Sequence, residues 1–340
     1  MMTRWSAVLG LLALGLAACG QGPAARATAA ALDLDASADV AVEASVEASV
    51  EALAVPDSGP DASTPPGFHA VWGSSATDVW AVGGGGMIRH FDGSAWTMSD
   101  SGTTENLTGV YGTSPGDVWV TGDMGTVFRW DGTSWTVASA ITQTLLLGVW
   151  ASGPADVWAV GIDSGAGGSG YVRHWDGKTW QDSDVPGSTS LWAVWGSGSK
   201  DVWMAGSTQG GTGLVLRGDG SNFNALPFSG APLRGIWGST ANDVWVTAYL
   251  GAIQHWDGTT WTAAPPATAV ALLGITGTGP SDVWAVGLDG VVFHYDGVTW
   301  SSSPTGTMDV LWSVWSSGPG DAWAAGAGAI LRWNGSAWKP

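Results

Sequence analysis

The chain has 340 residues, including 53 glycines, 25 tryptophans and a single cysteine, and its formal net charge is −18. These proportions depart from those of an average globular domain. The negative charge argues against nucleic acids and anionic lipids as partners.

The first 18 residues predict a lipoprotein signal peptide. Arg4 precedes an apolar run from Ala7 to Leu16, which is too short to span a bilayer stably. The sequence LAAC at 16–19 resembles the bacterial lipobox, and the resemblance implies lipidation of Cys19 and membrane contact through the lipid alone. Gly20 replaces the aspartate associated with inner-membrane retention, which favours the outer membrane. An ordinary secretory signal is the alternative.

Residues 19–66 predict a flexible tether that begins at the lipidated cysteine. Ala, Asp, Ser, Val and Pro dominate this segment, and it contains no aromatic residue. The stretch VEASVEASVEAL at 42–53 has the spacing of a short helix. It offers too little apolar surface to fold alone.

Residues 67–340 consist of seven similar units, each marked by the phrase Asp-(Val/Ala)-Trp at spacings of 39 to 45 residues. Each unit predicts four strands, exemplified by LWAVWG (191–196), DVWAVG (156–161), AIQHWDG (252–258) and TWT (260–262). An Asp-Gly or Asn-Gly hairpin turn precedes the fourth strand. The pattern predicts an all-β, seven-bladed β-propeller whose first and last blades meet side by side.

The repeated phrase also resembles known propeller repeats. DVWAVG followed by HWDG and a tryptophan is similar to the repeats of tectonin-type lectins, and DGTTW at 257–261 resembles a shortened Asp-box of bacterial sialidases. The first resemblance implies glycan binding. In the second group the motif shapes a turn and carries no chemistry.

A basic residue precedes the aromatic position of every third strand, and an aspartate opens every second strand. Because these two strands are antiparallel, we expect one contact in each blade. The predicted pairs are Asp78–His90, Asp117–Arg129, Asp156–His174, Asp201–Arg217, Asp243–His255, Asp282–His294 and Asp321–Arg332. The four histidines are one blade apart, so no metal site and no cofactor are expected.

Most of the tryptophans in residues 67–340 occupy repeated positions, and only Trp192 and Trp312 do not. They share the second position of a first strand with His69 and Arg234, and this position varies between units. We therefore expect His69, Trp192, Arg234 and Trp312 to bind a ligand at the mouth of the central channel. Length variation falls on the same rim, with insertions at 162–170 and 207–213.

The sequence predicts a monomeric, non-catalytic lipoprotein of the bacterial envelope that binds a glycan or an envelope protein through this rim. One alternative is a protein scaffold within an envelope assembly. A second is a sialidase-like hydrolase that uses Arg173, Arg234 and Tyr249. Glu105 is the only glutamate of the predicted propeller, which disfavours that chemistry.

Overall fold

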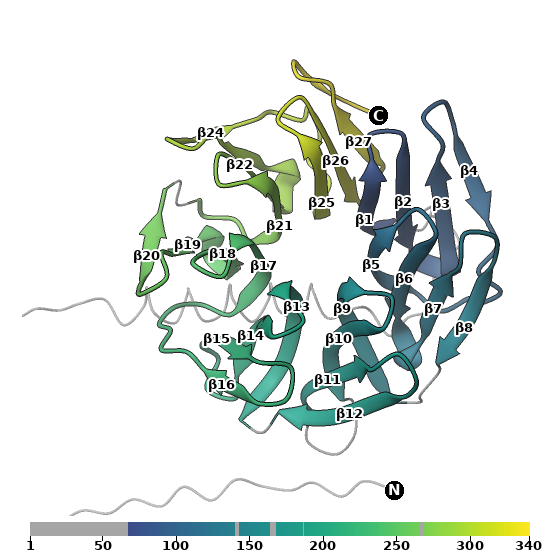
Figure 1. Ribbon diagram of the computed structural model, residues 1–340. Coiled ribbons are helices and arrows are strands. Elements are labelled where there is room, and N and C mark those ends of the chain that lie inside the picture. The colour runs from purple at the N-terminus through teal and green to yellow at the C-terminus, as the bar shows by residue number, and fades with distance from the viewer. Residues whose placement is uncertain (1–66, 140–142, 164–167, 186, 266–267) are drawn as a thin grey trace, which may run out of the picture. The chain divides into compact units, whose positions relative to one another are not determined.

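The computed structural model describes residues 67–139, 143–163, 168–185, 187–265 and 268–340. These residues belong to the second of two compact units, Pro60–Pro340. The predicted signal peptide, Cys19 and the tether lie outside the described residues. Within the described part, 28 strands form seven antiparallel sheets of four strands, arranged as the blades of a ring (Figure 1).

In the first four blades, the four strands of each sheet follow one another in the sequence. Their strands are β1 (Phe68–Ser75), β2 (Asp78–Gly83), β3 (Met87–Phe91) and β4 (Trp96–Ser99); β5 (Leu107–Ser114), β6 (Asp117–Gly122), β7 (Val127–Trp130) and β8 (Trp135–Ser139); β9 (Thr144–Gly153), β10 (Asp156–Asp163), β11 (Ser169–Trp175) and β12 (Trp180–Val185); β13 (Ser188–Gly198), β14 (Asp201–Thr208), β15 (Gly213–Gly218) and β16 (Phe223–Ala225).

The last three blades follow the same plan. Their strands are β17 (Leu233–Thr240), β18 (Asp243–Ala248), β19 (Ile253–Trp256) and β20 (Trp261–Ala264); β21 (Leu272–Gly279), β22 (Asp282–Gly287), β23 (Val292–Tyr295) and β24 (Trp300–Ser302); β25 (Leu311–Gly318), β26 (Asp321–Gly326), β27 (Ile330–Trp333) and β28 (Trp338–Lys339). Short 3-10 turns link second and third strands at η1 (Gly84–Gly86), η2 (Asp123–Gly125), η3 (Tyr249–Gly251) and η4 (Leu288–Gly290).

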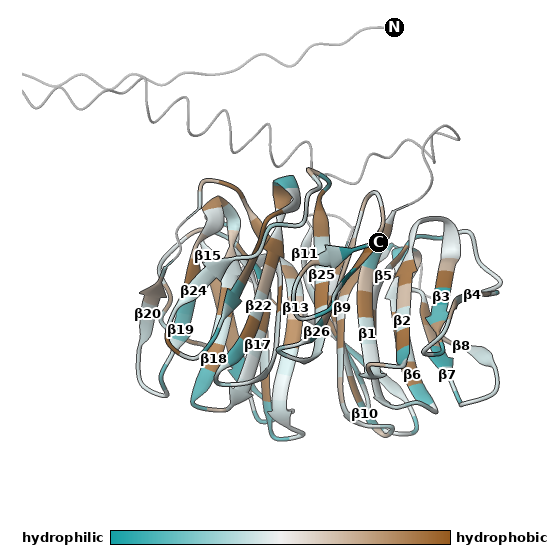
Figure 2. Cartoon of the chain, turned by 90° about the horizontal axis from the view of Figure 1, so that it is seen from above, coloured by the Kyte–Doolittle hydropathy of each residue, from teal (hydrophilic) through white to brown (hydrophobic). Residues whose placement is uncertain are grey.

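The first strand of each blade lines the centre of the ring, and the fourth lies at the periphery (Figure 1). Hydrophobic residues run along the strands, while hydrophilic residues gather toward their ends (Figure 2). Strand β1 packs beside both β5 and β25, so the two ends of the repeat meet without exchanging a strand. The predicted seven-bladed propeller is confirmed.

The tryptophan of each second strand joins its blade to the next one. Its ring lies 5.0 to 6.5 Å from the aromatic residues that flank the next blade's hairpin turn. Trp80 thus contacts Trp130 and Trp135, and Trp323 closes the ring on Phe91 and Trp96. Such contacts add to the free energy gained by burying the rings themselves.

Small residues accommodate the tryptophans that lie near the end of first strands. A Cβ atom added to Gly196 would lie 2.5 Å from the Trp150 ring of the preceding blade. The same close approach occurs between Trp72 and Gly112, and between Trp315 and Gly73. The glycine that follows this tryptophan therefore makes room for the ring of the neighbouring blade.

The two rims of the ring differ in construction. One rim carries the Asp-Gly hairpin turns, and we call it the turn rim. The opposite rim carries the 3-10 turns and the connections between blades, and we call it the variable rim. The backbone amide of Gly84 in η1 donates to the Gly67 carbonyl oxygen at 3.0 Å, which ties the 3-10 turn to the start of β1.

Candidate functional site

The seven predicted Asp-to-base contacts are all present within the blades. The histidine Nε2 atoms lie 2.5 to 2.7 Å from aspartate oxygens in the pairs Asp78–His90, Asp156–His174, Asp243–His255 and Asp282–His294. The arginine Nε atoms lie 2.6 to 2.9 Å from carboxylate oxygens in Asp117–Arg129, Asp201–Arg217 and Asp321–Arg332. Each base also packs on the second-strand tryptophan of its own blade, as His174 does on Trp158 at 3.8 Å between ring centroids.

Sequence reasoning missed a second partner of each aspartate, although the spacing of the sequence signals it. A serine or threonine four residues before each aspartate donates its hydroxyl to the second carboxylate oxygen, as Ser197 does to Asp201 at 2.6 Å. The full set is Ser74, Thr113, Ser152, Ser197, Ser239, Thr278 and Ser317. In this order the carboxylate separates the hydroxyl from the histidine. The base therefore cannot take the hydroxyl proton, as nucleophilic catalysis would require.

These contacts alter the electrostatics of the buried aspartates. Burial raises the pKa of Asp282, but hydrogen bonds from His294 and Thr278 outweigh burial and hold the pKa below its usual value. Asp243 follows the same balance, with a lowered pKa, through His255 and Ser239. Across the described residues, no three His, Cys, Asp or Glu side chains are grouped closely enough to hold a metal ion.

The first strands enclose a central cavity of about 340 Å³. Each of these strands contributes the residue at one equivalent position of the repeat to the lining: His69, Thr108, Leu147, Trp192, Arg234, Leu273 and Trp312. All four residues predicted to bind a ligand therefore line one cavity. Within its described lining there is no aspartate or glutamate.

Two of these positions serve the architecture. The His69 Nδ1–H donates to the Leu107 carbonyl oxygen at 2.9 Å, and the Thr108 hydroxyl donates to the Leu146 carbonyl oxygen. Both bonds link one blade to the innermost strand of the next. Burial lowers the pKa of His69, which favours the neutral ring. His69 is thus an inter-blade bridge as well as a lining residue.

Arg234 and Trp192 form a stacked pair in the cavity wall. The guanidinium carbon lies 3.3 Å from the Trp192 ring centroid and 4.5 Å from that of Tyr249. The Trp192 indole N–H donates to the Ser190 hydroxyl at 2.9 Å, which fixes the orientation of the ring. Arg234 is only 6% exposed, and its Nε–H has no hydrogen-bond partner among the described residues.

The electrostatic position of Arg234 is unusual. Burial lowers the pKa of Arg234 to about 10, and interactions with Tyr249 partly oppose this effect. Burial in turn raises the pKa of the Tyr249 hydroxyl. The guanidinium therefore remains charged at neutral pH. It has no ion-pair partner among the described residues.

Arg173, the third residue of the hydrolase alternative, lies elsewhere. Its Nε–H donates to Asp182 at 2.8 Å, its Nη1–H donates to Ser139 at 2.7 Å, and its guanidinium packs over Trp180. It therefore joins two blades on strand β11, apart from the Arg234 and Tyr249 pair. The structure brings together only two of these three residues.

The variable rim combines exposed apolar side chains with strained backbone. Met124 and Leu250 occupy the middle of η2 and η3 with φ values of 56° and 65°, and they are 48% and 52% exposed. Gly85 holds the equivalent place in η1. Met308, in the connection between the last two blades, is 76% exposed.

The two predicted insertions extend strands rather than forming loops alone. Residues 162–163 and 169–170 belong to β10 and β11, and 207–208 and 213 belong to β14 and β15. Residues 164–167 lie outside the described part. The extra residues continue an existing hydrogen-bond ladder, which satisfies their backbone groups.

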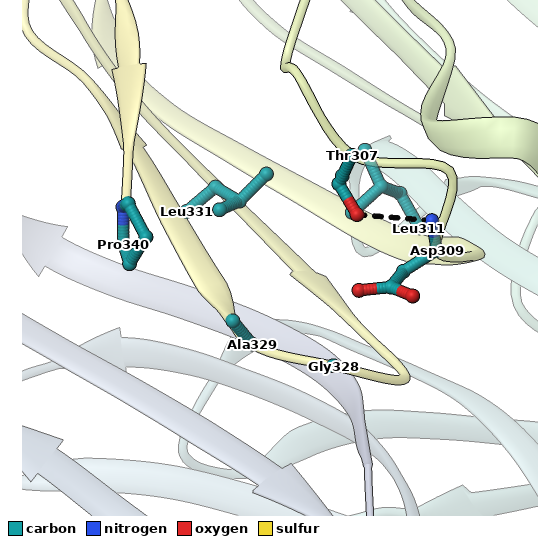
Figure 3. A pocket seen from close by; sticks show the side chains of 7 residues that line it. All are labelled: Thr307, Asp309, Leu311, Gly328, Ala329, Leu331 and Pro340. Carbon is teal, nitrogen blue, oxygen red and sulfur yellow. Dashed lines mark hydrogen bonds between the residues drawn. The ribbon is translucent and has the colours of Figure 1, made fainter.

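A smaller cavity of about 160 Å³ opens on the variable rim beside the last blade (Figure 3). Thr307 and Asp309 face Gly328 and Ala329 across it, and Leu331 and Pro340 complete the lining. The backbone amide of Asp309 donates to the Thr307 hydroxyl at 3.0 Å. Among the side chains that line this cavity there is one carboxylate and no cationic group.

The fold and its central cavity define the chain as a seven-bladed β-propeller. No protein-family model and no curated protein match its sequence. Solved structures that resemble it include YCF48 bound to D1 peptide, with a TM-score of 0.63, 16% identity and coverage of 80% of this chain and 92% of that one. YCF48 from Cyanidioschyzon merolae has a TM-score of 0.61, 16% identity and coverage of 81% and 96%. The WD40 propeller domain of Doa1 has a TM-score of 0.62 and 12% identity, with coverage of 79% of this chain and 92% of that one.

At these identities the likeness concerns the fold alone. A shared propeller fold does not by itself assign a function. Across the described residues no helix has the length and hydrophobicity needed to cross a bilayer.

Proposed function

We propose that the protein is a non-catalytic binding protein whose propeller holds a protein partner on its variable rim and at the mouth of the central cavity. The observation that carries this proposal is the exposure and the backbone conformation of Met124 and Leu250. Each is a large apolar residue with an exposed side chain and a left-handed backbone. A left-handed non-glycine residue costs about 1–2 kcal/mol.

The fold does not require this arrangement, because η1 makes the same turn with Gly85. Apolar side chains held outward on a rigid turn suit contact with another protein. Leu250 follows Tyr249, the ring that packs on Arg234, so this rim residue is adjacent in sequence to a residue that contacts the cavity wall. One propeller of similar fold is named as bound to a peptide, which supports the same mode of use here.

The test introduces a photo-crosslinking amino acid at Leu250 in the full-length protein, expressed in its native host. We expect one discrete cross-linked protein product. The matched control places the same group at Val298, which is 82% exposed on the turn rim. Equal products from both positions, or none from Leu250, would contradict a partner on the variable rim.

A glycan is the second candidate ligand, and Trp312 favours it. This partly exposed indole lines the central cavity, and none of the ring contacts found among the described residues involves it. Trp192 is less suitable, because Arg234 covers one face of its ring. A glycan array that gives equal signals for the wild type and the Trp192→Ala, Trp312→Ala double variant would exclude sugar stacking at these residues.

We further propose that Cys19 is acylated and anchors the protein to the outer membrane through residues 19–66. The lipobox-like sequence LAAC supports this proposal. Metabolic labelling with an alkyne fatty acid should mark the wild type, and the Cys19→Ala variant should lose both the label and the membrane fraction. Labelling that persists in the variant would contradict lipidation at this residue.

A further inference from the structure

We propose that Arg234 is the receptor for a carboxylate of the bound partner, namely an Asp or Glu side chain of a peptide segment that enters the central cavity. This inference rests on the proposed protein-binding function and names the chemistry of its ligand. Neither the repeat nor the packing of the blades explains an arginine at this place. The corresponding residues of the other blades are histidine, threonine, leucine and tryptophan.

Arg234 lacks a counter-ion among the described residues. Arg234 is 6% exposed, and a buried charge without a partner destabilises a folded protein. Four of the other five described arginines contrast with it: Arg129, Arg217 and Arg332 pair with the aspartate of their blade, and Arg173 pairs with Asp182. Packing over Trp192 and Tyr249 compensates in part through cation–π attraction. A carboxylate from outside would supply the ion pair that the described residues lack.

The guanidinium of Arg234 is already held in position. Trp192 lies against one side of it, and the Trp192 ring is itself held by the hydrogen bond to Ser190. Stacking covers the face of a planar guanidinium and not the N–H donors in its plane, and this edge of donors matches the two oxygens of a carboxylate. The unpartnered Nε–H belongs to this edge.

The charge of the cavity also favours an acidic ligand. Its described lining has no acidic residue, and burial favours the neutral form of His69. Arg234 is thus the only fixed charge among the described lining residues, inside a protein whose formal net charge is −18. An acidic group that passes the repelling exterior meets a single, weakly screened cation.

A peptide suits this cavity because seven strand edges surround it. Strands β1, β5, β9, β13, β17, β21 and β25 each pair with a strand of their own sheet on one side only. Their inner edges face the ring centre and offer backbone donors and acceptors to an extended chain. A volume of about 340 Å³ lies within the range of ligand pockets.

The test uses an array of heptapeptides that carry Asp or Glu at the fourth position and mixed residues elsewhere, each beside its Asn or Gln counterpart. We expect the wild-type propeller to retain the acidic member of bound pairs about tenfold more tightly. Arg234→Met should abolish this preference and leave the melting temperature unchanged or higher, because it removes an uncompensated buried charge. Lys178→Met is the matched control, since it removes one positive charge from an exposed turn.

If Arg234→Met does not fold, the wild-type protein alone can test the site. Free acetate should then displace the bound acidic peptides, and chloride at equal ionic strength should not. Acidic and amide peptides bound equally, or a preference that survives in Arg234→Met, would overturn the carboxylate site and leave protein binding intact. Retention of uronate-bearing glycans in place of peptides would overturn the peptide ligand. An array without any bound peptide, together with no cross-linked product at Leu250, would overturn the proposed function itself.

Discussion

In the third, fourth and sixth blades, the aspartate that opens the second strand organises three side chains at once. Asp156 accepts hydrogen bonds from Ser152, His174 and the Trp158 indole N–H, the last at 3.1 Å. It thereby fixes the histidine that stacks on Trp158, and Trp158 in turn packs against Phe223 of the next blade. One carboxylate thus connects a turn, a blade face and an interface between blades.

Replacing Asp156 by alanine should therefore destabilise the propeller by about 1–3 kcal/mol, since three donors lose their acceptor. Urea unfolding followed by tryptophan fluorescence measures the change. Asp156→Asn keeps one acceptor oxygen and should therefore lower the free energy of unfolding by less than Asp156→Ala does. A midpoint for Asp156→Ala equal to that of the wild type would show that the network contributes nothing.

The glycines beneath first-strand tryptophans give a steric prediction. Gly196→Ala should destabilise by about 1–3 kcal/mol through overpacking, because the new methyl group would overlap the Trp150 ring. Gly198→Ala, two residues away with open space around it, should be close to neutral.

The chain itself suggests how to rescue Gly196→Ala. In the third blade, Ala151 takes the place of this glycine. The preceding blade has Tyr111 in the place of the tryptophan, and Ala151 and the smaller Tyr111 ring pack in one cluster. Trp150→Tyr should accordingly restore part of the stability lost in Gly196→Ala. Additive losses in this double-mutant cycle would contradict the packing argument.

At the level of elements, the hairpin turns depend on ionised carboxylates. The Oδ1 atom of Asp131 accepts from the backbone amides of Thr133 and Ser134 at 2.8 and 2.9 Å, and Gly132 has a φ of 95°. These bonds, with that of the Thr133 hydroxyl, lower the pKa of Asp131 to about 2, and Asp92 shows the same value for the same reason. The pKa values of Asp176, Asp219, Asp257 and Asp296 are also lowered.

A lowered folded-state pKa means that the stabilisation is complete above the unfolded value of 3.8 and is lost as the pH falls through about 2. We expect the melting temperature to fall steeply between pH 4 and pH 2. Asn334 makes the same turn without a charge, so Asp131→Asn should fold at pH 7 and lose less on acidification. A variant with the full acid sensitivity of the wild type would contradict this origin.

The sequence predicted the elements well because they repeat. Seven copies of one pattern average out local ambiguity, and the Asp-Gly turns fix the third and fourth strands. The contacts across blades were harder to predict. That Arg234 packs on Trp192 depends on side chains 42 residues apart in neighbouring blades, and Tyr249 joins them from a turn outside the strand pattern. The hydroxyls before each aspartate were predictable from spacing alone.

At the level of the whole molecule, closure depends on side chains and not on a shared strand. Trp323 packs between Phe91 and Trp96, the Val71 amide donates to Ser313 at 3.2 Å, and each end blade is complete in itself. The junction between the last and first blades is thus built like the other six.

A circular permutant should therefore fold. We expect a chain that begins at Leu233 and ends at Pro232, with a short linker from Pro340 to Gly67, to keep the near-ultraviolet circular dichroism and single cooperative unfolding of residues 67–340. Two separate unfolding transitions in the permutant would show that the natural junction is special. Aggregation of the permutant under conditions that keep residues 67–340 soluble in their natural order would show the same.

The second-strand tryptophan always reaches into the following blade and never into the preceding one. The contact between blades is consequently heterologous and has a direction, like the head-to-tail contact of a cyclic oligomer. Such a molecule is, in effect, a covalently tethered heptamer of 40-residue subunits, and gene duplication could add or remove a whole subunit without inventing a new contact.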